Sequence, residues 1–217
     1  MAFGSASSAD VFATRGLAKF AAALAGLKAP TVVDLGAAVG ANVTFLGELF
    51  GCKLHVEDVL SAADIWWPPP PNGDAEEDSD AKGAEEREAA LEAARHLGHQ
   101  SGSVDGVLCW DVFDYLQAEA AAALGREVTR VLKPGGVTFV CHGPRDREVQ
   151  GPVQYEILDE MTLRYRTVEV ARPPRSVRES REMTRLFAGL SIDSSFLLKS
   201  RMRELVLRKP LETLPTG

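Results

Sequence analysis

Cysteine is scarce in this sequence, and its spacing forms no ligand pattern. The chain of 217 residues contains three cysteines, Cys52, Cys109 and Cys141, and all three lie in apolar stretches. The odd number and the absence of a Cys-x-x-Cys pair argue against a disulfide framework and against a cysteine-based zinc site. We therefore expect buried free thiols in a reducing compartment.

Long apolar runs are missing as well. No uncharged stretch approaches the ~20 residues that a membrane-spanning helix needs. The N-terminal residues contain no basic segment, and Asp10, Arg15 and Lys19 interrupt their apolar residues. We therefore expect no signal peptide, and we interpret the chain as a cytoplasmic protein.

Basic residues are fewer than acidic ones over the whole chain, whose formal net charge is −7. This balance does not favour binding to nucleic acid. The charge is uneven, because residues 1–125 carry 7 Lys/Arg against 19 Asp/Glu, whereas residues 126–210 carry 17 against 11. The basic second half either meets an anionic partner or forms solvated faces of the fold, and the sequence leaves both interpretations open.

The first half contains a recognisable strand–helix–strand unit. Thr31–Leu35 is β-branched and apolar and predicts a strand. Apolar residues then recur at helical spacing from Asn42 to Phe50, and Gly51 is placed to end that helix. Lys53–Val56 predicts the second strand. Such a unit implies a parallel sheet with a right-handed crossover.

The rest of the chain extends this pattern. The expected elements are an opening helix within Ala9–Leu27, a strand at Gly106–Cys109, a helix at Ala118–Val131, a tight turn at Leu132–Gly136, a strand at Val137–Cys141, a β-hairpin near 153–170, a helix at Ser176–Ala188, and closing strands at Ile192–Leu198 and Arg203–Leu207. We predict one domain over residues 1–217, with a flexible acidic linker at 68–83 and no convincing third strand around it. The expected fold is a doubly wound, Rossmann-like, three-layer α/β/α arrangement. Its sheet is mostly parallel and ends with an antiparallel strand.

The loop Asp34-Leu-Gly-Ala-Ala-Val-Gly40 follows the first predicted strand. Ligands of open α/β sheets bind beyond the carboxyl ends of the strands, and glycines there let the backbone approach a ligand. Glu57 and Asp58 end the next strand, where a carboxylate can hold both hydroxyls of a ribose. A dinucleotide fingerprint would need further glycines at positions 38 and 41, where the chain has alanine.

The motif DLGAAVG resembles the loop D-x-G-x-G-x-G of the class I S-adenosylmethionine-dependent methyltransferases. VEDV, VLCWDVFDYL and RVLKPGG, in this order, are similar to later landmarks of that family. The resemblance implies S-adenosyl-L-methionine as cofactor and methyl transfer as the reaction. The cofactor-binding residues that it implies are Asp34, Gly36, Ala37, Gly40, Asn42, Glu57, Asp58, Trp110 and Asp111. Two departures are Ala38 at the middle glycine and the lack of an adenine-contacting acidic residue within 74–80.

Catalytic residues are less clearly marked. His142 follows the fifth predicted strand on the ligand side of the sheet and is our candidate for a general base, with Asp111 and Asp114 as rival bases. A loop histidine bound to backbone is the competing interpretation for His142, and helix capping is the competing one for Asp111 and Asp114. His96 and His99 have no third ligand nearby, so we expect no metal site.

The acceptor is not identified by the sequence. A small molecule or a protein fits, and an anionic acceptor would suit six arginines of the predicted hairpin and following helix, Arg164, Arg166, Arg172, Arg175, Arg178 and Arg181. These arginines could equally pair with the acidic first half, within one chain or across a homodimer. Two other functions stay open: a non-catalytic binding or interaction module on the same fold, and a nucleotide-dependent oxidoreductase, which the loop spacing disfavours.

Overall fold

The computed structural model describes residues 11–59, 97–143, 153–167 and 178–211. Its main sheet has the strand order β3-β2-β4-β5-β9-β8. The strands are β2 (Thr31–Asp34), β3 (Lys53–Val56), β4 (Val104–Trp110), β5 (Leu132–His142), β8 (Ser191–Leu197) and β9 (Arg203–Arg208). The first four run parallel, whereas β9 is antiparallel to both β5 and β8. The predicted mostly parallel sheet with an antiparallel end is confirmed.

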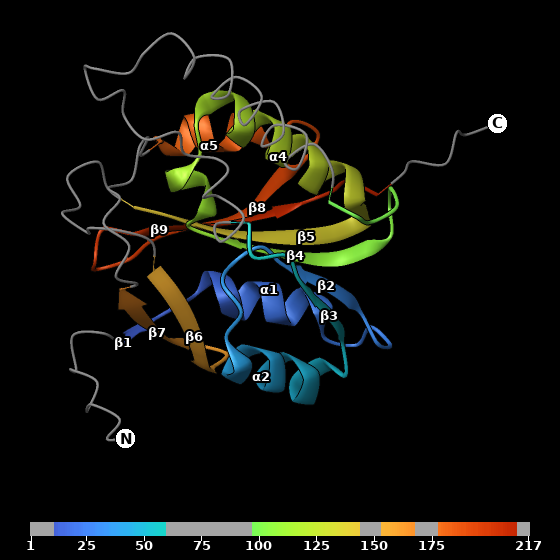
Figure 1. Ribbon diagram of the computed structural model, residues 1–217, viewed down its shortest axis with the longest axis vertical. Coiled ribbons are helices and arrows are strands. Elements are labelled where there is room, and N and C mark those ends of the chain that lie inside the picture. The colour runs from blue at the N-terminus through green and yellow to red at the C-terminus, as the bar shows by residue number, and fades with distance from the viewer. Residues whose placement is uncertain (1–10, 60–96, 144–152, 168–177, 212–217) are drawn as a thin grey trace, which may run out of the picture.

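Helices cover both faces of this sheet (Figure 1). On one face lie α4 (Ala118–Val131) and α5 (Ser180–Leu186), and on the other lie α1 (Gly16–Leu24) and α2 (Gly40–Phe50). Each face has its own apolar core. Phe113, Leu124 and Phe187 belong to the α4 side, and Phe20, Leu46 and Phe139 belong to the α1 side. The expected three-layer α/β/α arrangement is therefore present.

The predicted strand–helix–strand unit is present as β2, α2 and β3. β2 lies between β3 and β4, so that its apolar residues Val32 and Val33 are buried on both faces. The helix α2 ends at Gly51, whose φ of +55° is a left-handed conformation that glycine adopts without strain. Because β2, β3 and β4 are parallel, their carboxyl ends meet at one edge of the sheet.

The predicted hairpin is present as β6 (Val153–Asp159) and β7 (Thr162–Thr167). It forms a separate three-stranded sheet of order β1-β7-β6, with β1 at Val11–Ala13. The prediction of helix was therefore wrong at Val11–Ala13, because these residues pair with β7 instead of continuing α1. Figure 1 shows this small sheet beside the start of α2.

Two further boundaries differ from the prediction. Leu132–Gly136 is not a separate turn but a bulge within β5, because five residues of β5 advance while β4 advances two, from Val104↔Leu132 to Gly106↔Val137. Helix α5 is shorter than expected and begins at Ser180 with a capping box between Glu179 and Glu182. The predicted acidic linker at 68–83 lies outside the described residues.

Candidate functional site

The carboxylate of Asp34 stands at the carboxyl end of β2 and is 2% exposed. Its Oδ1 accepts the backbone N–H of Gly36 at 2.9 Å and the indole Nε1–H of Trp110 at 2.6 Å. Trp110 is the last residue of β4, the strand beside β2. The parallel pairing of two strands thus brings together two residues that lie 76 positions apart in the chain.

This environment shifts the proton affinity of Asp34. Burial raises its pKa from 3.8 to about 6, the donors Gly36 and Trp110 act in the opposite direction, and the nearby charge of Asp58 raises it further. The site therefore holds a carboxylate that is costly to keep ionised. Any cation or N–H donor that reaches this group gains a strong partner.

Trp110 occupies the space in front of the glycine loop. Its indole is 3% exposed, lies face to face with Tyr155 of β6 at 5.2 Å and meets the edge of Phe139 at 5.8 Å. The backbone of Trp110 has φ +48°, a left-handed conformation that costs a bulky residue about 1–2 kcal/mol. The surrounding contacts hold the residue in this strained conformation.

The need for glycine at position 36 follows from this indole. A Cβ on Gly36 would lie 2.5 Å from Cδ1 and 2.9 Å from Nε1 of Trp110, which is closer than van der Waals contact. A Cβ on Gly40 would meet nothing within 4 Å. Gly36 is thus the close-approach position of the loop, and the group that approaches it here is the side chain of Trp110.

Tyr155 connects the inserted hairpin to this cluster. Its hydroxyl donates to Asp111 Oδ2 at 3.0 Å, and the hydroxyl of Tyr115 donates to the same oxygen at 3.4 Å. Asn42 of α2 holds the backbone of the hairpin, since its Nδ2 donates to Tyr155 O and its Oδ1 accepts from Ile157 N, both at 2.7 Å. Asn42 and Asp111 therefore fasten the hairpin over the strand ends.

Glu57 and Asp58, the two residues after β3, have different neighbours. Glu57 is exposed, and its Oε1 lies 3.1 Å from His99 Nε2. The ring of His99 meets the edge of the His55 ring at 4.8 Å. Asp58 has φ +36° and acts on Asp34 through its charge. Of the two predicted ribose ligands, Asp58 is the one that the structure brings to the Asp34 cluster.

The candidate bases are both buried. His142, the last residue of β5, is 2% exposed, and its Nε2 lies 3.3 Å from Ser180 Oγ. Burial and the nearby charge of Arg203 lower its pKa from 6.5 to about 4, so the imidazole is neutral near pH 7. Helix capping, the competing interpretation of Asp111, is not what its side chain does in the structure. Asp111 precedes the short helix η3 (Val112–Tyr115) without a side-chain capping bond and binds the two tyrosines instead.

Among the remaining predicted residues, Ala37 is half-buried and Gly40 is exposed as the first residue of α2. Asp114 accepts the N–H of Gly143 at 2.7 Å. Tyr155 belongs to the site although its sequence position did not indicate this. It lies in the hairpin that was predicted near 153–170, but nothing in the sequence showed which face of that hairpin would turn toward the strand ends.

Several arginines of the predicted cluster have acidic or carbonyl partners. Arg164 and Arg166 both bind Glu156 within the hairpin, at 3.3 and 3.2 Å. Arg178 donates to the carbonyl oxygens of Phe113 and Leu116. Arg172 and Arg175 lie outside the described residues. Local pairing accounts for these three arginines, so the structure gives no added support to an anionic acceptor.

The indole of Trp110 stands between this site and the cofactor that the resemblance implies. Asp34 is 2% exposed and shares Oδ1 between Gly36 and Trp110, so S-adenosylmethionine reaches neither Asp34 nor the Gly36 backbone while the indole stays in place. In the described conformation the site does not fit the cofactor. Within the described part of the chain, no group of three His, Cys, Asp or Glu side chains could hold a metal ion, and His96 lies outside it.

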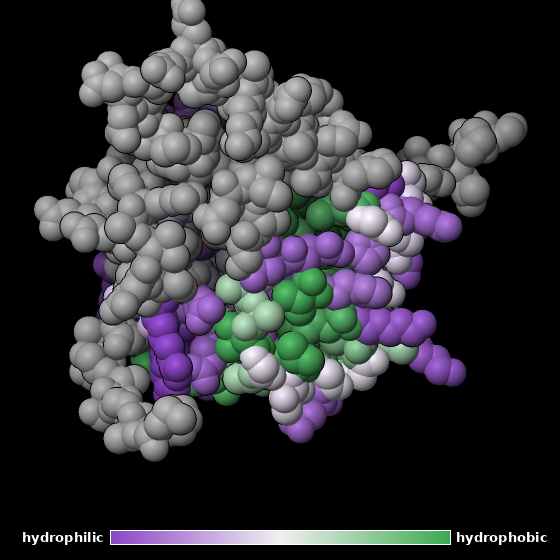
Figure 2. Space-filling model, viewed as in Figure 1, coloured by the Kyte–Doolittle hydropathy of each residue, from purple (hydrophilic) through white to green (hydrophobic). Residues whose placement is uncertain are grey.

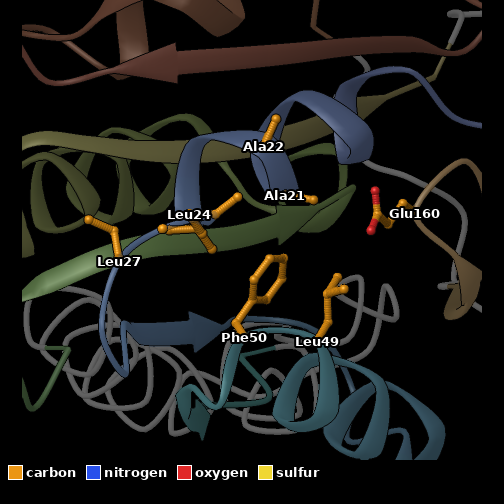
Figure 3. A pocket seen from close by; sticks show the side chains of 9 residues that line it. Ala21, Ala22, Leu24, Leu27, Leu49, Phe50 and Glu160 are labelled. Atoms are coloured by element: carbon orange, nitrogen blue, oxygen red, sulfur yellow. The ribbon is translucent and has the colours of Figure 1, made fainter.

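A pocket of about 240 Å³ lies elsewhere, between the ends of α1 and α2 (Figure 3). Leu24 and Phe50 point toward it from the two helices, and Glu160 closes one end. It is lined by none of the predicted site residues, and Glu160 is its one titratable side chain. This pocket lacks the polar groups that catalysis requires.

Comparison with known proteins gives one family match. The model described as a methyltransferase domain matches residues 71–140, which begin inside the predicted acidic linker and end within β5. No curated protein matches the chain.

Solved structures with the same fold are similar at low sequence identity. A putative methyltransferase of Haloferax volcanii, in complex with the Trm112 methyltransferase activator, is 16% identical with a TM-score of 0.51, over 90% of each chain. An S-adenosylmethionine-dependent methyltransferase from Aquifex aeolicus is 16% identical with a TM-score of 0.50, over 88% of each chain. The [4+2]-cyclase SpnF is 13% identical with a TM-score of 0.50, over 90% of this chain and 80% of its own. These likenesses show the fold.

Proposed function

The chain carries a methyltransferase-domain match on the fold of class I S-adenosylmethionine-dependent methyltransferases, and we propose that it transfers a methyl group from S-adenosylmethionine to an acceptor still to be identified. The observation that carries this proposal is the meeting of Asp34, Gly36 and Asp58 at the adjacent ends of β2 and β3. These groups lie beyond the carboxyl ends of adjacent parallel strands, where open α/β sheets bind their ligands.

Residue roles belong to the proposal. Once the indole of Trp110 is displaced, Asp34 and the Gly36 backbone would meet the cofactor, with Asp58 at the ribose. Asp111 and His142 are the proposed bases: Asp111 binds the hydroxyl of Tyr155, which stacks on Trp110, and His142 ends β5, the strand beside β4. The imidazole of His142 is neutral near pH 7 and able to accept a proton, but its lowered pKa makes it a weak base there. Methyl transfer depends mainly on alignment and exclusion of water, so the base is secondary to the pocket.

We propose that the methyl acceptor is a small molecule or a protein and that the chain works in the cytoplasm. None of the helices in the described part of the chain has the length and apolar character needed to cross a bilayer. The three free cysteines support our proposal of a cytoplasmic protein, since an oxidising compartment selects for disulfides.

A second function has its own support. Trp110 and Tyr155 bury each other over the glycine loop, which favours a non-catalytic module that has kept the fold. The cyclase SpnF carries the same fold under a different activity, so the fold alone does not decide the reaction.

Calorimetric titration with S-adenosylmethionine, S-adenosylhomocysteine and NAD tests these alternatives. We expect the two adenosyl ligands to bind wild type and Gly47→Ala equally, because a Cβ on Gly47 meets nothing within 4 Å. Gly36→Val should lose both ligands, because its side chain would fill the space that a ligand of the loop needs. Formation of S-adenosylhomocysteine with added acceptors then reports turnover. Binding without turnover on any acceptor supports the non-catalytic module, and selective binding of NAD contradicts the methyltransferase proposal.

A further inference from the structure

We infer that Trp110 is a built-in competitor of the cofactor: its indole occupies the Asp34 carboxylate and the open face of Gly36, and the cofactor binds by displacing it. This inference rests on the proposed function. It reverses the role that the resemblance implied, in which Trp110 is a ligand of the cofactor. The two roles predict opposite effects of removing the indole, so they can be separated by experiment.

The competition follows from the hydrogen bonds on Asp34. The indole N–H at 2.6 Å and the Gly36 N–H at 2.9 Å both use Oδ1, and the rest of the residue is buried. A cationic or N–H donor group of a ligand needs the same carboxylate. The ring also lies where a group approaching the Gly36 backbone must pass. When the ligand enters, one of its donor groups therefore replaces the indole N–H of Trp110 on Asp34.

Two sets of interactions hold the indole in place. Tyr155 covers one face of the ring in a parallel stack at 6°, and its hydroxyl is fixed by Asp111. Asn42 ties the backbone of the same hairpin to α2 through two hydrogen bonds of 2.7 Å. The hairpin β6–β7 is thus the part of the chain that keeps Trp110 inward.

The backbone conformation of Trp110 opposes the closed arrangement, in which the indole covers Asp34 and Gly36. Trp110 has φ +48°, a sparsely populated backbone conformation that costs a residue other than glycine free energy and persists only where surrounding contacts hold it. A closed state held by tertiary contacts against backbone strain is suited to having a second conformation. The apparent dissociation constant then equals the intrinsic one divided by the open fraction, so the indole sets the affinity without contributing a bond to the ligand.

The test is a calorimetric titration of S-adenosylhomocysteine into four proteins: wild type, Trp110→Ala, Tyr155→Phe and Phe187→Leu. We expect Trp110→Ala to bind about 10-fold tighter or more, equivalent to about 1.4 kcal/mol. Tyr155→Phe keeps the stack but loses the bond to Asp111 and should fall between Trp110→Ala and wild type. Phe187→Leu is the matched control, because it removes aromatic packing against Phe113 in the apolar core on the other face of the sheet; its affinity should equal that of wild type.

A second measurement keeps the indole intact and does not depend on the folding of Trp110→Ala. In a Trp66→Phe, Trp67→Phe chain, Trp110 is the remaining tryptophan. Saturation with S-adenosylhomocysteine should move its emission to longer wavelength and increase its quenching by acrylamide, because the ring leaves its buried position.

The outcomes separate the two proposals. Tighter binding in Trp110→Ala together with the emission shift supports the competitor. Weaker binding in Trp110→Ala, or binding to the intact chain with the indole still shielded, overturns the competitor and leaves the proposed function standing. No binding to any of the four folded proteins overturns the proposed function, and the competitor with it.

Discussion

The two glycines of the loop after β2 have opposite surroundings. Gly36 faces the indole of Trp110 at distances that exclude a methyl group, whereas Gly40 opens into empty space at the start of α2. Glycine at position 36 is therefore required by packing. At position 40 it is tolerated at an entropic cost, since a helix favours alanine.

Alanine substitutions should expose this difference. Gly36→Ala forces the indole or the loop to move, and we expect a loss of about 1–3 kcal/mol in the free energy of unfolding. Gly40→Ala should be neutral or stabilise by up to about 1 kcal/mol. Urea unfolding of the two variants gives the comparison. Equal stability of both variants would show that the indole is not packed against Gly36 in solution.

The sequence located these glycines and Asp34 but did not reveal their partner. The end of a strand can be predicted from its apolar pattern, and the predicted strand Gly106–Cys109 puts Trp110 directly at such an end. The direction of its side chain depends on φ +48° and on Tyr155, which comes from another part of the chain. Such a conformation is set by tertiary packing, which no local pattern encodes.

At the scale of elements, the start of α1 depends on a strand far away in the chain. Its N-cap residue, Arg15, makes no side-chain capping bond, and Thr14 Oγ1 accepts Leu17 N at 3.2 Å. The fully buried carboxylate of Glu204 in β9 accepts Gly16 N at 2.7 Å, Arg15 N at 3.0 Å and Thr14 Oγ1 at 2.5 Å. Glu204 therefore satisfies two N–H groups at the helix N-terminus, fixes the hydroxyl of Thr14 and connects the helix to the sheet.

Removing this carboxylate should destabilise the fold strongly. Each buried donor left without an acceptor costs about 1–3 kcal/mol, so we expect Glu204→Ala to lose about 3 kcal/mol or more. Glu204→Gln is the control. Its oxygen can still accept from Arg15 and Gly16, and its amide can donate to Thr14, so its loss should be clearly smaller. Chemical denaturation measures both. A Glu204→Gln variant as unstable as Glu204→Ala would mean that charge, and not hydrogen bonding, holds α1.

The elements that the sequence predicted best are those with a regular apolar period and a clear end. Residues 53–56 and 118–131 were predicted with the bounds that the structure has. The N-terminal helix was extended too far because Val11–Ala13 is apolar, and short apolar runs suit strand and helix alike. Pairing with β7 decides the conformation of those residues.

At the scale of the whole molecule, apolar side chains remain on the surface where Figure 1 places α2 and β3, as Figure 2 shows. Val43 and Leu49 of α2 are 45% and 39% exposed. Two of the buried ionisable groups, Asp34 and His142, end strands of the main sheet. Asp34 is on β2 and His142 on β5, so the sheet as a unit carries both of their proton equilibria.

These two groups act on stability in opposite directions. Burial raises the pKa of Asp34 from 3.8 to about 6, so the folded state favours its protonated form. Its contribution to stability is full below pH 3.8 and is lost as the pH rises through about 6. Burial lowers the pKa of His142 from 6.5 to about 4, so its contribution is full above pH 6.5 and is lost as the pH falls toward 4.

Each shift corresponds to about 3 kcal/mol, so in wild type the two effects largely offset each other between about pH 4 and about pH 7. Asp34→Asn should leave the His142 effect alone and make the protein lose stability on acidification over this range. His142→Gln should leave the Asp34 effect alone and make the protein gain stability on acidification. The double variant restores the wild-type slope, because both protonation differences are absent. Urea unfolding in pH steps gives the four slopes. Parallel slopes for wild type and Asp34→Asn would mean that Asp34 is solvated in solution, and that the indole does not seal it from water.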